Sequence, residues 1–298
     1  MRKHLLGVLS LALVLSGCSQ AHVMIQNSSD EIMTIGSQTY TKEDEFNFQK
    51  KSNGPSGTIQ LALRTIYEKE VGMNDDILAE AKKQVQESID SVDDFETQIK
   101  NVGYKDIEDY TNKVAVSGVQ AEHLLKKYLK DDKKAVKEKL EPSMAGIFEF
   151  DSEDNAKKAL DALKNGKDAA EVKEQFSTEE ATYVGTTQFV STQNTDLPIR
   201  MVNSLSVAKK AGALDEVFFN ESQEAPVYYV AVLDSNDYDK NIDAYAAALK
   251  EDQAFNEDCL VYYLDKYEFE VHDQDIFNYF KANNPRYLVT RPDLSENK

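Results

Sequence analysis

Histidine and cysteine are the side chains best suited to hold a metal ion, and their spacing in this chain argues against that role. Outside the N-terminal leader the histidines are His22, His123 and His272, which are scattered, with no paired spacing and no cysteine partner. His123 is expected on a helix and His272 near a helix start, where ordinary surface or capping roles explain them. The histidines therefore predict no metal site and no bound cofactor.

Motifs for hydrolysis and phosphate binding are also missing from the sequence. There is no G-x-S-x-G elbow, although counting alone leaves a Ser/His/Asp hydrolase open. The stretch VGTTQF lacks the spacing and the lysine of a phosphate-binding loop. Glu179 and Glu180, or the acidic group at 151–154, could be imagined as an acid–base pair or a calcium site. In a chain with 53 acidic residues, solvated surface explains them better.

The two cysteines occur in different settings. Cys18 follows the small residues Ser16 and Gly17, after a basic start and an apolar run shorter than the roughly 20 residues that span a bilayer. This order resembles the lipobox of bacterial lipoproteins, so we expect residues 1–17 to be removed and Cys18 to carry lipid; an uncleaved anchor helix is the alternative. Cys259 then has no disulfide partner, and its apolar neighbours predict a small core residue.

The charge of the chain limits its partners. Against the 53 acidic residues stand 34 lysines and arginines, which gives a formal net charge of −19 at pH 7. A chain this acidic is not expected to bind the phosphate backbone of nucleic acids. An anionic lipid surface would also repel it, so membrane attachment has to come from the lipid. Basic or neutral unfolded chains are the partners that this charge accommodates best.

The elements that must position any site begin after a polar tether at 18–30. Short strands are predicted at 32–35 and 39–40, and Thr41 with Asp44 predicts the start of a helix in a near-capping-box arrangement. The chain then reads as helical to about residue 140. We expect helix ends at Gly72 and Gly103, as glycine commonly terminates helices.

The pattern changes after Pro142. MAGIFEF predicts a strand, 151–165 a helix that Gly166 stops, LPIRMVNSLSVAK a helix that Gly212 stops, and APVYYVAVLDS a closing strand. From 239 the chain returns to one long helix, then a shorter helix beginning near Asp273 and a loose polar tail. The middle segment therefore predicts a small α/β unit between helical segments.

The order of these features resembles the PrsA-type foldase lipoproteins, to which SurA-like periplasmic chaperones are related. IGSQTYTKED is similar to the opening of that family, KNGKDAAEVKEQFS to its inserted domain and YYLDKYEFEVHDQDI to its closing helix. The resemblance implies an α+β fold with a helical chaperone module and an inserted parvulin-like domain. Its expected parts are a signal peptide at 1–17, a lipidated tether at 18–30, helical segments at 31–141 and 236–298, and the parvulin-like domain at 142–235.

The residues of this sequence that match the parvulin active-site positions are not the family's catalytic ones. The first histidine falls at Gly146, the acid at Thr186 and the second histidine at Tyr228. The pocket phenylalanine falls near Val202 and the pocket methionine near Pro198. The departures are thus concentrated in the active site, whereas the scaffold matches.

Two interpretations of this domain remain, since isomerisation of an X-Pro bond needs no net proton transfer. Either the domain still isomerises X-Pro bonds with reduced activity, or it only packs against other elements, acts as a spacer or binds polypeptide chain. The combined loss of the histidines, the acid and the pocket residues favours the second interpretation, since fold alone does not imply function. We therefore expect a foldase or chaperone for newly exported polypeptides on the outer face of a single-membrane, Gram-positive bacterium. A homodimer is left open. The alternatives are an active peptidyl-prolyl isomerase and a surface lipoprotein that binds a ligand or partner.

Overall fold

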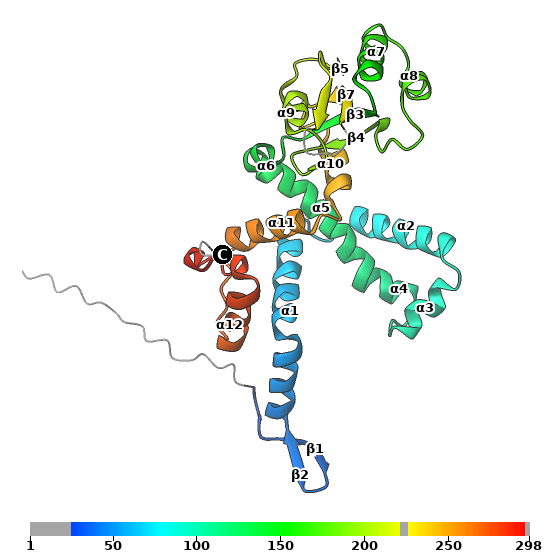
Figure 1. Ribbon diagram of the computed structural model, residues 1–298. Helices are drawn as coiled ribbons and strands as arrows, with labels where there is room; N and C mark the ends of the chain where they lie inside the picture. Colours follow the sequence, from blue (N-terminus) through cyan, green and yellow to red (C-terminus); the bar gives the residue numbers. More distant parts are fainter. Residues whose placement is uncertain (1–24, 221–225, 296–298) are drawn as a thin grey trace, which may run out of the picture. The chain divides into compact units, whose positions relative to one another are not determined.

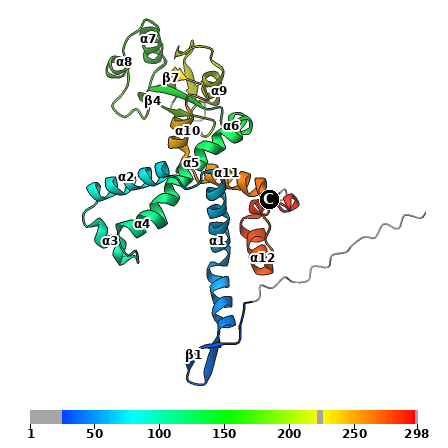
Figure 2. The same cartoon turned by 180° about the vertical axis from the view of Figure 1, so that it is seen from behind.

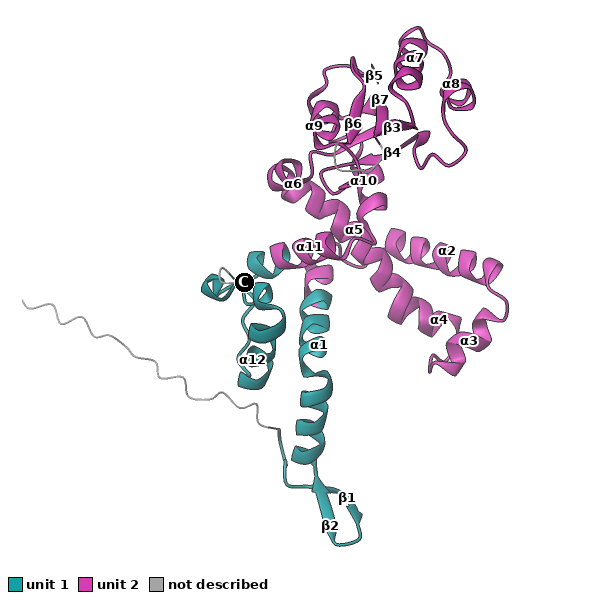
Figure 3. Ribbon diagram, viewed as in Figure 1, with its two compact units in different colours: residues 1–64, 263–298 teal, residues 65–262 magenta. Residues whose placement is uncertain are grey.

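The computed structural model describes residues 25–220 and 226–295 (Figure 1). Contacts divide the chain into two compact units, residues 1–64 with 263–298 and residues 65–262 (Figure 3). Two helices, α1 and α11, cross from one unit into the other. The predicted boundaries at 142 and 235 are a different division of the chain, and they stay a prediction.

The first unit combines the N-terminal elements with the end of the chain. β1 (Glu31–Ile35) and β2 (Gln38–Thr41) form an antiparallel hairpin, with Gly36 at φ +63° in the turn. Helix α1 (Lys42–Glu70) follows without a break and continues through Pro55. The C-terminal part adds α12 (Gln274–Asn283) and two short 3₁₀ turns, η2 (Pro285–Tyr287) and η3 (Pro292–Leu294).

The second unit is helical on both sides of its sheet in the sequence. Its helices before the sheet are α2 (Asp75–Ser91), α3 (Phe95–Asn101), α4 (Ile107–Tyr110), the π-helical turn η1 (Thr111–Ala115), α5 (Val116–Asp131) and α6 (Lys133–Leu140). After the sheet come α10 (Ile242–Leu249) and α11 (Gln253–Lys266). The rings of Tyr128 in α5 and Phe255 in α11 pack together, and the Tyr238 hydroxyl donates to the Leu129 carbonyl. These contacts join the two helical segments.

Five strands form the sheet of the second unit, with the order β4-β3-β7-β5 and with β6 also paired to β7. The strands are β3 (Ser143–Phe150), β4 (Val184–Val190), β5 (Gly212–Ala213), β6 (Phe218–Asn220) and β7 (Val227–Ser235). All the pairs are antiparallel. The helices between them are α7 (Glu153–Lys164), α8 (Ala169–Phe176) and α9 (Ile199–Val207).

Helices cover both faces of this sheet. Side chains alternate along β3 and β7, so each strand contributes apolar residues to both faces. On one face Phe148 and Phe150 pack against Ala159 of α7 and Val172 of α8. On the other face the buried residues include Ala145, Ile147, Tyr229 and Ala231 of the strands and Met201, Val202 and Leu205 of α9. Figures 1 and 2 show α7 and α8 on one side of the strands and α9 on the other.

The predicted α+β class is confirmed, as are most of the predicted helix ends. Gly72, Gly103 and Gly166 follow the ends of α1, α3 and α7, each with a positive φ angle. Three details were wrong. The long C-terminal helix is two helices, because Asp252 accepts from the Phe255 amide and begins a new one.

The other two errors concern Gly212 and the tail. Gly212 lies in β5, paired with Leu233, and the preceding helix already ends at Val207. The described start of the tail is not loose: Leu288 is buried at 3 % exposure, and the ring of Tyr287 packs against Phe280. Gly212 pairs with a strand that follows later in the chain, whereas the start of the tail packs against the neighbouring helix α12.

Candidate functional site

The parvulin-equivalent positions lie on two neighbouring strands, an adjacent bulge and a helix. Gly146 in the middle of β3 is opposite Thr187 of β4 and Val232 of β7. Tyr228 in β7 is opposite Phe150, four residues further along β3. At about 3.3 Å per residue, this register separates the backbone positions of Gly146 and Tyr228 by about 13 Å. The structure therefore does not bring these two positions together.

The remaining positions are no closer to forming one site. Val202 of α9 is fully buried in the cluster with Ala145 and Ile147, on the α9 face of the sheet. Gly146 belongs to the opposite face by the alternation along β3, and Tyr228 packs into the cluster of that face. Thr186 is exposed, at a point where the β3–β4 register shifts. The four positions are thus divided between the faces and one edge of the sheet.

Two glycines close the sheet at the position of the first family histidine. A Cβ atom added to Gly146 would lie 2.5 Å from the carbonyl oxygen of Gly185 in β4, a distance that no real side chain tolerates. Gly185 has a φ of +83°, and a Cβ atom there would lie 2.1 Å from the buried ring of Phe148. The backbone of β4 therefore fills the space into which a side chain at residue 146 would extend, and the Phe148 ring fills the corresponding space at residue 185.

A phenol beside this sheet is held in its protonated form. The hydroxyl of Tyr183 donates to the Asp196 carboxylate, and its ring packs edge-on against Tyr229. Burial, together with the hydrogen bond to Asp196, raises the pKa of Tyr183 well above its usual value. A protonated phenol donates hydrogen bonds but does not act as a base at neutral pH.

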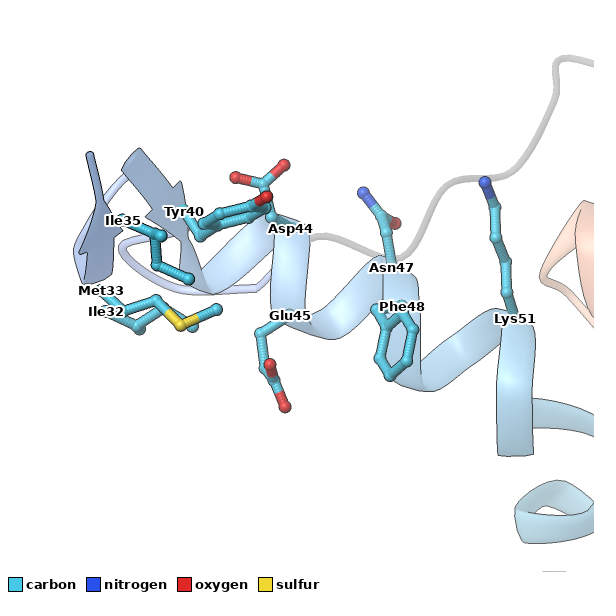
Figure 4. Close-up of a pocket in the computed structure, with 9 residues that line it drawn as sticks. All are labelled: Ile32, Met33, Ile35, Tyr40, Asp44, Glu45, Asn47, Phe48 and Lys51. Carbon is cyan, nitrogen blue, oxygen red and sulfur yellow. The ribbon is translucent and has the colours of Figure 1, made fainter. Parts of the chain in front are cut away.

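A groove between the hairpin and the start of α1 is a better candidate for binding. It has a volume of about 660 Å³ and is lined by Ile32, Met33, Ile35, Tyr40, Asp44, Glu45, Asn47, Phe48 and Lys51. Figure 4 shows the side chains of Ile32, Met33 and Ile35 beside Tyr40, with Phe48 one turn along the helix from Asp44 and Glu45. The apolar members are well exposed, at 66 % for both Ile35 and Phe48.

Local interactions explain why the hairpin leads directly into α1. The Asp44 carboxylate accepts from the backbone amide and the hydroxyl of Thr41, and the Asp44 amide is bonded to the Thr41 hydroxyl. This capping box begins the helix immediately after β2. The hydrogen bonds from Thr41 hold the pKa of Asp44 below its usual value, so this carboxylate stays charged. The predicted strand–turn–strand and helix cap are therefore present.

The sequence predicts the hairpin but not the groove, which lies between the hairpin and a helix. The signal available in the sequence was the lack of alternation in β1, where the apolar residues Ile32 and Met33 are adjacent. In the structure every residue of this strand is exposed. A hollow between helices also exists, of about 550 Å³ between α2 and the α4–η1 segment, lined in part by Leu78, Ile89 and Ile107.

The other chemistry-bearing residues do not form a site in the part of the chain that the structure describes. His123 is bonded to Glu80 at 2.8 Å, and His272 lies near Glu270. No cluster of three or more potential metal ligands occurs within residues 25–220 and 226–295. Cys259 is buried as expected, and burial raises the pKa of its thiol to about 12. Cys18 and His22 lie outside the described residues.

Comparison with known proteins found structural likeness only. No protein-family model and no curated protein sequence matches the chain. Among solved structures, the PrsA peptidylprolyl isomerase of Bacillus cereus matches at 16 % identity and a TM-score of 0.45, covering 86 % of this chain and 98 % of that one. The foldase PrsA of Streptococcus pneumoniae matches at 18 % identity and a TM-score of 0.37, over 86 % and 99 %. The PrsA of Bacillus subtilis matches at 16 % identity and a TM-score of 0.37, covering 84 % of this chain and 99 % of that one. The chain is similar in fold to these PrsA structures, which confirms the resemblance that the sequence predicts.

Proposed function

We propose that this protein is a lipid-anchored, extracytoplasmic foldase that holds apolar segments of newly exported polypeptides while they fold. The observation that carries the proposal is the hairpin–α1 groove, with its exposed Ile32, Met33, Ile35, Tyr40 and Phe48. Soluble proteins seldom expose contiguous apolar side chains of this size unless they bind something. Unfolded polypeptides present the complementary apolar surface.

The properties of the groove suit transient binding. Burying apolar surface contributes about 25 cal/mol per Å², so a short apolar segment would gain only a few kcal/mol before the entropy of ordering it is subtracted. Contacts of this strength form and break quickly. A client segment would therefore be shielded from aggregation and then released to fold.

The parvulin-like domain contributes structure rather than isomerase activity in this proposal. Support comes from the backbone contact between Gly146 and Gly185, which leaves no room for a side chain at residue 146. The 13 Å separation of Gly146 from Tyr228 points the same way. Uncatalysed prolyl isomerisation takes about 10–100 s at 25 °C, so the proposal predicts that clients isomerise on this time scale.

Attachment to the membrane would come from Cys18, through the predicted lipidation. No helix in the described part of the chain is both long and apolar enough to span a bilayer. The test is to express the full chain and its Cys18→Ala variant in a Gram-positive host and to follow incorporation of labelled palmitate. We expect label and membrane association for the parent only; an unlabelled parent would contradict this part of the proposal.

The function itself is tested by aggregation of a chemically unfolded client in the presence of the chain from residue 19 onward. We expect the parent to suppress aggregation and Phe48→Ala to suppress it several-fold less. The matched control is Phe219→Ala, which removes an equally large ring, 50 % exposed, from β6. Absence of suppression, or an equal loss in both variants, would contradict the proposed role of the groove.

A proline-peptide assay on the same preparation separates the two activities. We expect no acceleration of cis–trans exchange above the uncatalysed rate. A clear acceleration would instead make the protein an active peptidyl-prolyl isomerase, whatever the outcome of the aggregation assay.

A further inference from the structure

The apolar groove between the hairpin and α1 has an acidic border. Two of its nine lining residues, Asp44 and Glu45, are carboxylates, and Lys51 is the only cation among the nine. In Figure 4 the side chains of Asp44 and Glu45 point to opposite sides of the helix, so they flank the apolar side chains. Two further exposed glutamates adjoin lining residues in the sequence: Glu31 precedes Ile32, and Glu43 precedes Asp44.

Two of the three neighbouring lysines are engaged with carboxylates outside this border. Lys42 pairs with Asp30. Lys50 is 9 % exposed and pairs with Asp273 at 3.2 Å and Asp275 at 2.7 Å. Of the three lysines in the first three turns of α1, only Lys51 lines the groove.

The two border carboxylates keep capacity for a further partner. Asp44 accepts both of its hydrogen bonds from Thr41 through Oδ2, which leaves Oδ1 open, and Glu45 accepts from Gln49 through Oε1. An ionised carboxylate offers about four acceptor positions. Lysine and arginine are the side chains that use such positions best, because they supply charged donors.

We infer that this groove selects apolar segments that carry lysine or arginine next to the apolar residues. The inference rests on the proposed function and names the class of client segment that the groove prefers. The net charge of −19 acts in the same direction, because a strongly acidic chain attracts cationic segments and repels acidic ones. Apolar contact supplies the affinity, and the carboxylate border supplies the preference.

The expected preference is modest, since these charges are exposed. Each exposed pair contributes about 0.2–1 kcal/mol, which is about 1.4- to 5-fold in binding. A segment with two cations should therefore bind about 2- to 25-fold more tightly than an uncharged one at low salt, and a segment with two anions should bind more weakly than either. The preference should fall to about twofold at 1 M salt, where the Debye length is only about 3 Å.

The test measures binding of three fluorescent peptides to the chain from residue 19 onward. The peptides share one apolar core and differ in their flanks, which are two lysines, two serines or two glutamates. We expect the order lysine, serine, glutamate, and we expect Glu45→Lys to reduce or reverse it. Glu45 is the residue to change, because Asp44 also caps the helix. Glu174→Lys, at an exposed position in α8, is the matched control for Glu45→Lys and should leave the order unchanged.

The outcomes separate this inference from the proposed function. Equal binding of all three peptides that is lost in Phe48→Ala would overturn the charge preference and leave the groove as the client site. No binding, or binding unaffected by Phe48→Ala, would overturn both. A parent that is dimeric in sedimentation and monomeric as Phe48→Ala would make the groove an interface between copies and would overturn the inference. Binding of the unlipidated chain to neutral lipid vesicles that Phe48→Ala abolishes would overturn it in favour of a membrane contact.

Discussion

At the scale of single residues, the contact between Gly146 and Gly185 decides whether the sheet of the second unit has room for a side chain at residue 146. Gly146 approaches Gly185 so closely that a Cβ atom on Gly146 would overlap the Gly185 carbonyl oxygen. The ring of Phe148 occupies the space above Gly185 and is completely buried. Glycine at residue 146 is therefore part of the packing of β3 on β4, and replacing this one residue by histidine would not create a site there.

We predict that Gly146→His destabilises the protein and confers no isomerase activity. The imidazole would have to displace the β4 backbone, and overpacking of this kind costs about 1–3 kcal/mol. Denaturant unfolding and the proline-peptide assay measure the two effects. Gly118→Ala is the control: it lies in α5 with open space around it, and it should stabilise by about 0.5–1 kcal/mol. A fully stable Gly146→His variant with isomerase activity would refute the claim that β4 leaves no room for a side chain at residue 146.

The second residue-scale prediction concerns the buried thiol of Cys259. Burial, with a smaller contribution from Asp258, raises its pKa from 9.0 to about 12. The folded thiol stays protonated while the unfolded one ionises, so this group lowers the free energy of unfolding as pH rises from about 9 to about 12. We expect a thiol reagent at pH 8 to label the chain from residue 19 onward only after unfolding. Rapid labelling of the native protein would show that the thiol is accessible.

At the scale of elements, one lysine links helix α1 to the start of helix α12 within the first unit. The Lys50 ammonium in α1 contacts both Asp273 and Asp275 at the start of α12, and Asp273 is itself only 5 % exposed. Asp273 also caps α12 by accepting from the amides of Asp275 and Ile276. The cap and one of the two ion pairs therefore depend on the same carboxylate, that of Asp273, which couples formation of α12 to its packing on α1.

We predict that Lys50→Ala loosens α12. Removing the cation leaves a buried carboxylate without its charged partner, a loss of about 1.5–3 kcal/mol. The hydrogen bond to Asp275 is the main reason that the pKa of Lys50 is raised, so its stabilising effect is complete below pH 10.5 and is lost above that value. Amide exchange in α12 should accelerate. Lys42→Ala, which removes a half-exposed pair with Asp30, should cost less than about 1 kcal/mol; equal effects would contradict the argument.

At the scale of the whole molecule, the chain is two compact units rather than one. The first unit contains the groove and the Lys50 cluster, and the second contains the sheet and most of the helices. Each unit has buried residues of its own, such as Phe280 in the first and Phe148 in the second. The proposed client site and the five-stranded sheet therefore belong to different units.

We predict two thermal transitions in scanning calorimetry. Lys50→Ala should lower one of them and Gly146→Ala the other, because each substitution affects contacts inside a single unit. The double variant should combine the two shifts additively. A single transition that both substitutions lower by the same amount would show instead that the helices crossing between the units make them unfold together.

Much of the local structure follows directly from short sequence patterns. Thr41 and Asp44 form the predicted cap, Gly166 ends α7, and MAGIFEF lies within β3. These features depend on hydrogen bonds and φ angles within a few residues of each other. The split between α10 and α11 was missed although Asp252 is a good capping residue, because the apolar pattern runs through both helices.

The sequence by itself determined the α+β class, the order of the elements and the absence of the family histidines, because caps, turns and alternation are local properties. Only the tertiary structure decided that Gly185 closes the space beside Gly146, that Val202 and Tyr228 belong to opposite faces, and that the hairpin and α1 leave an apolar groove with an acidic border. Each of these depends on strand register or on packing between elements, which no short stretch of sequence specifies.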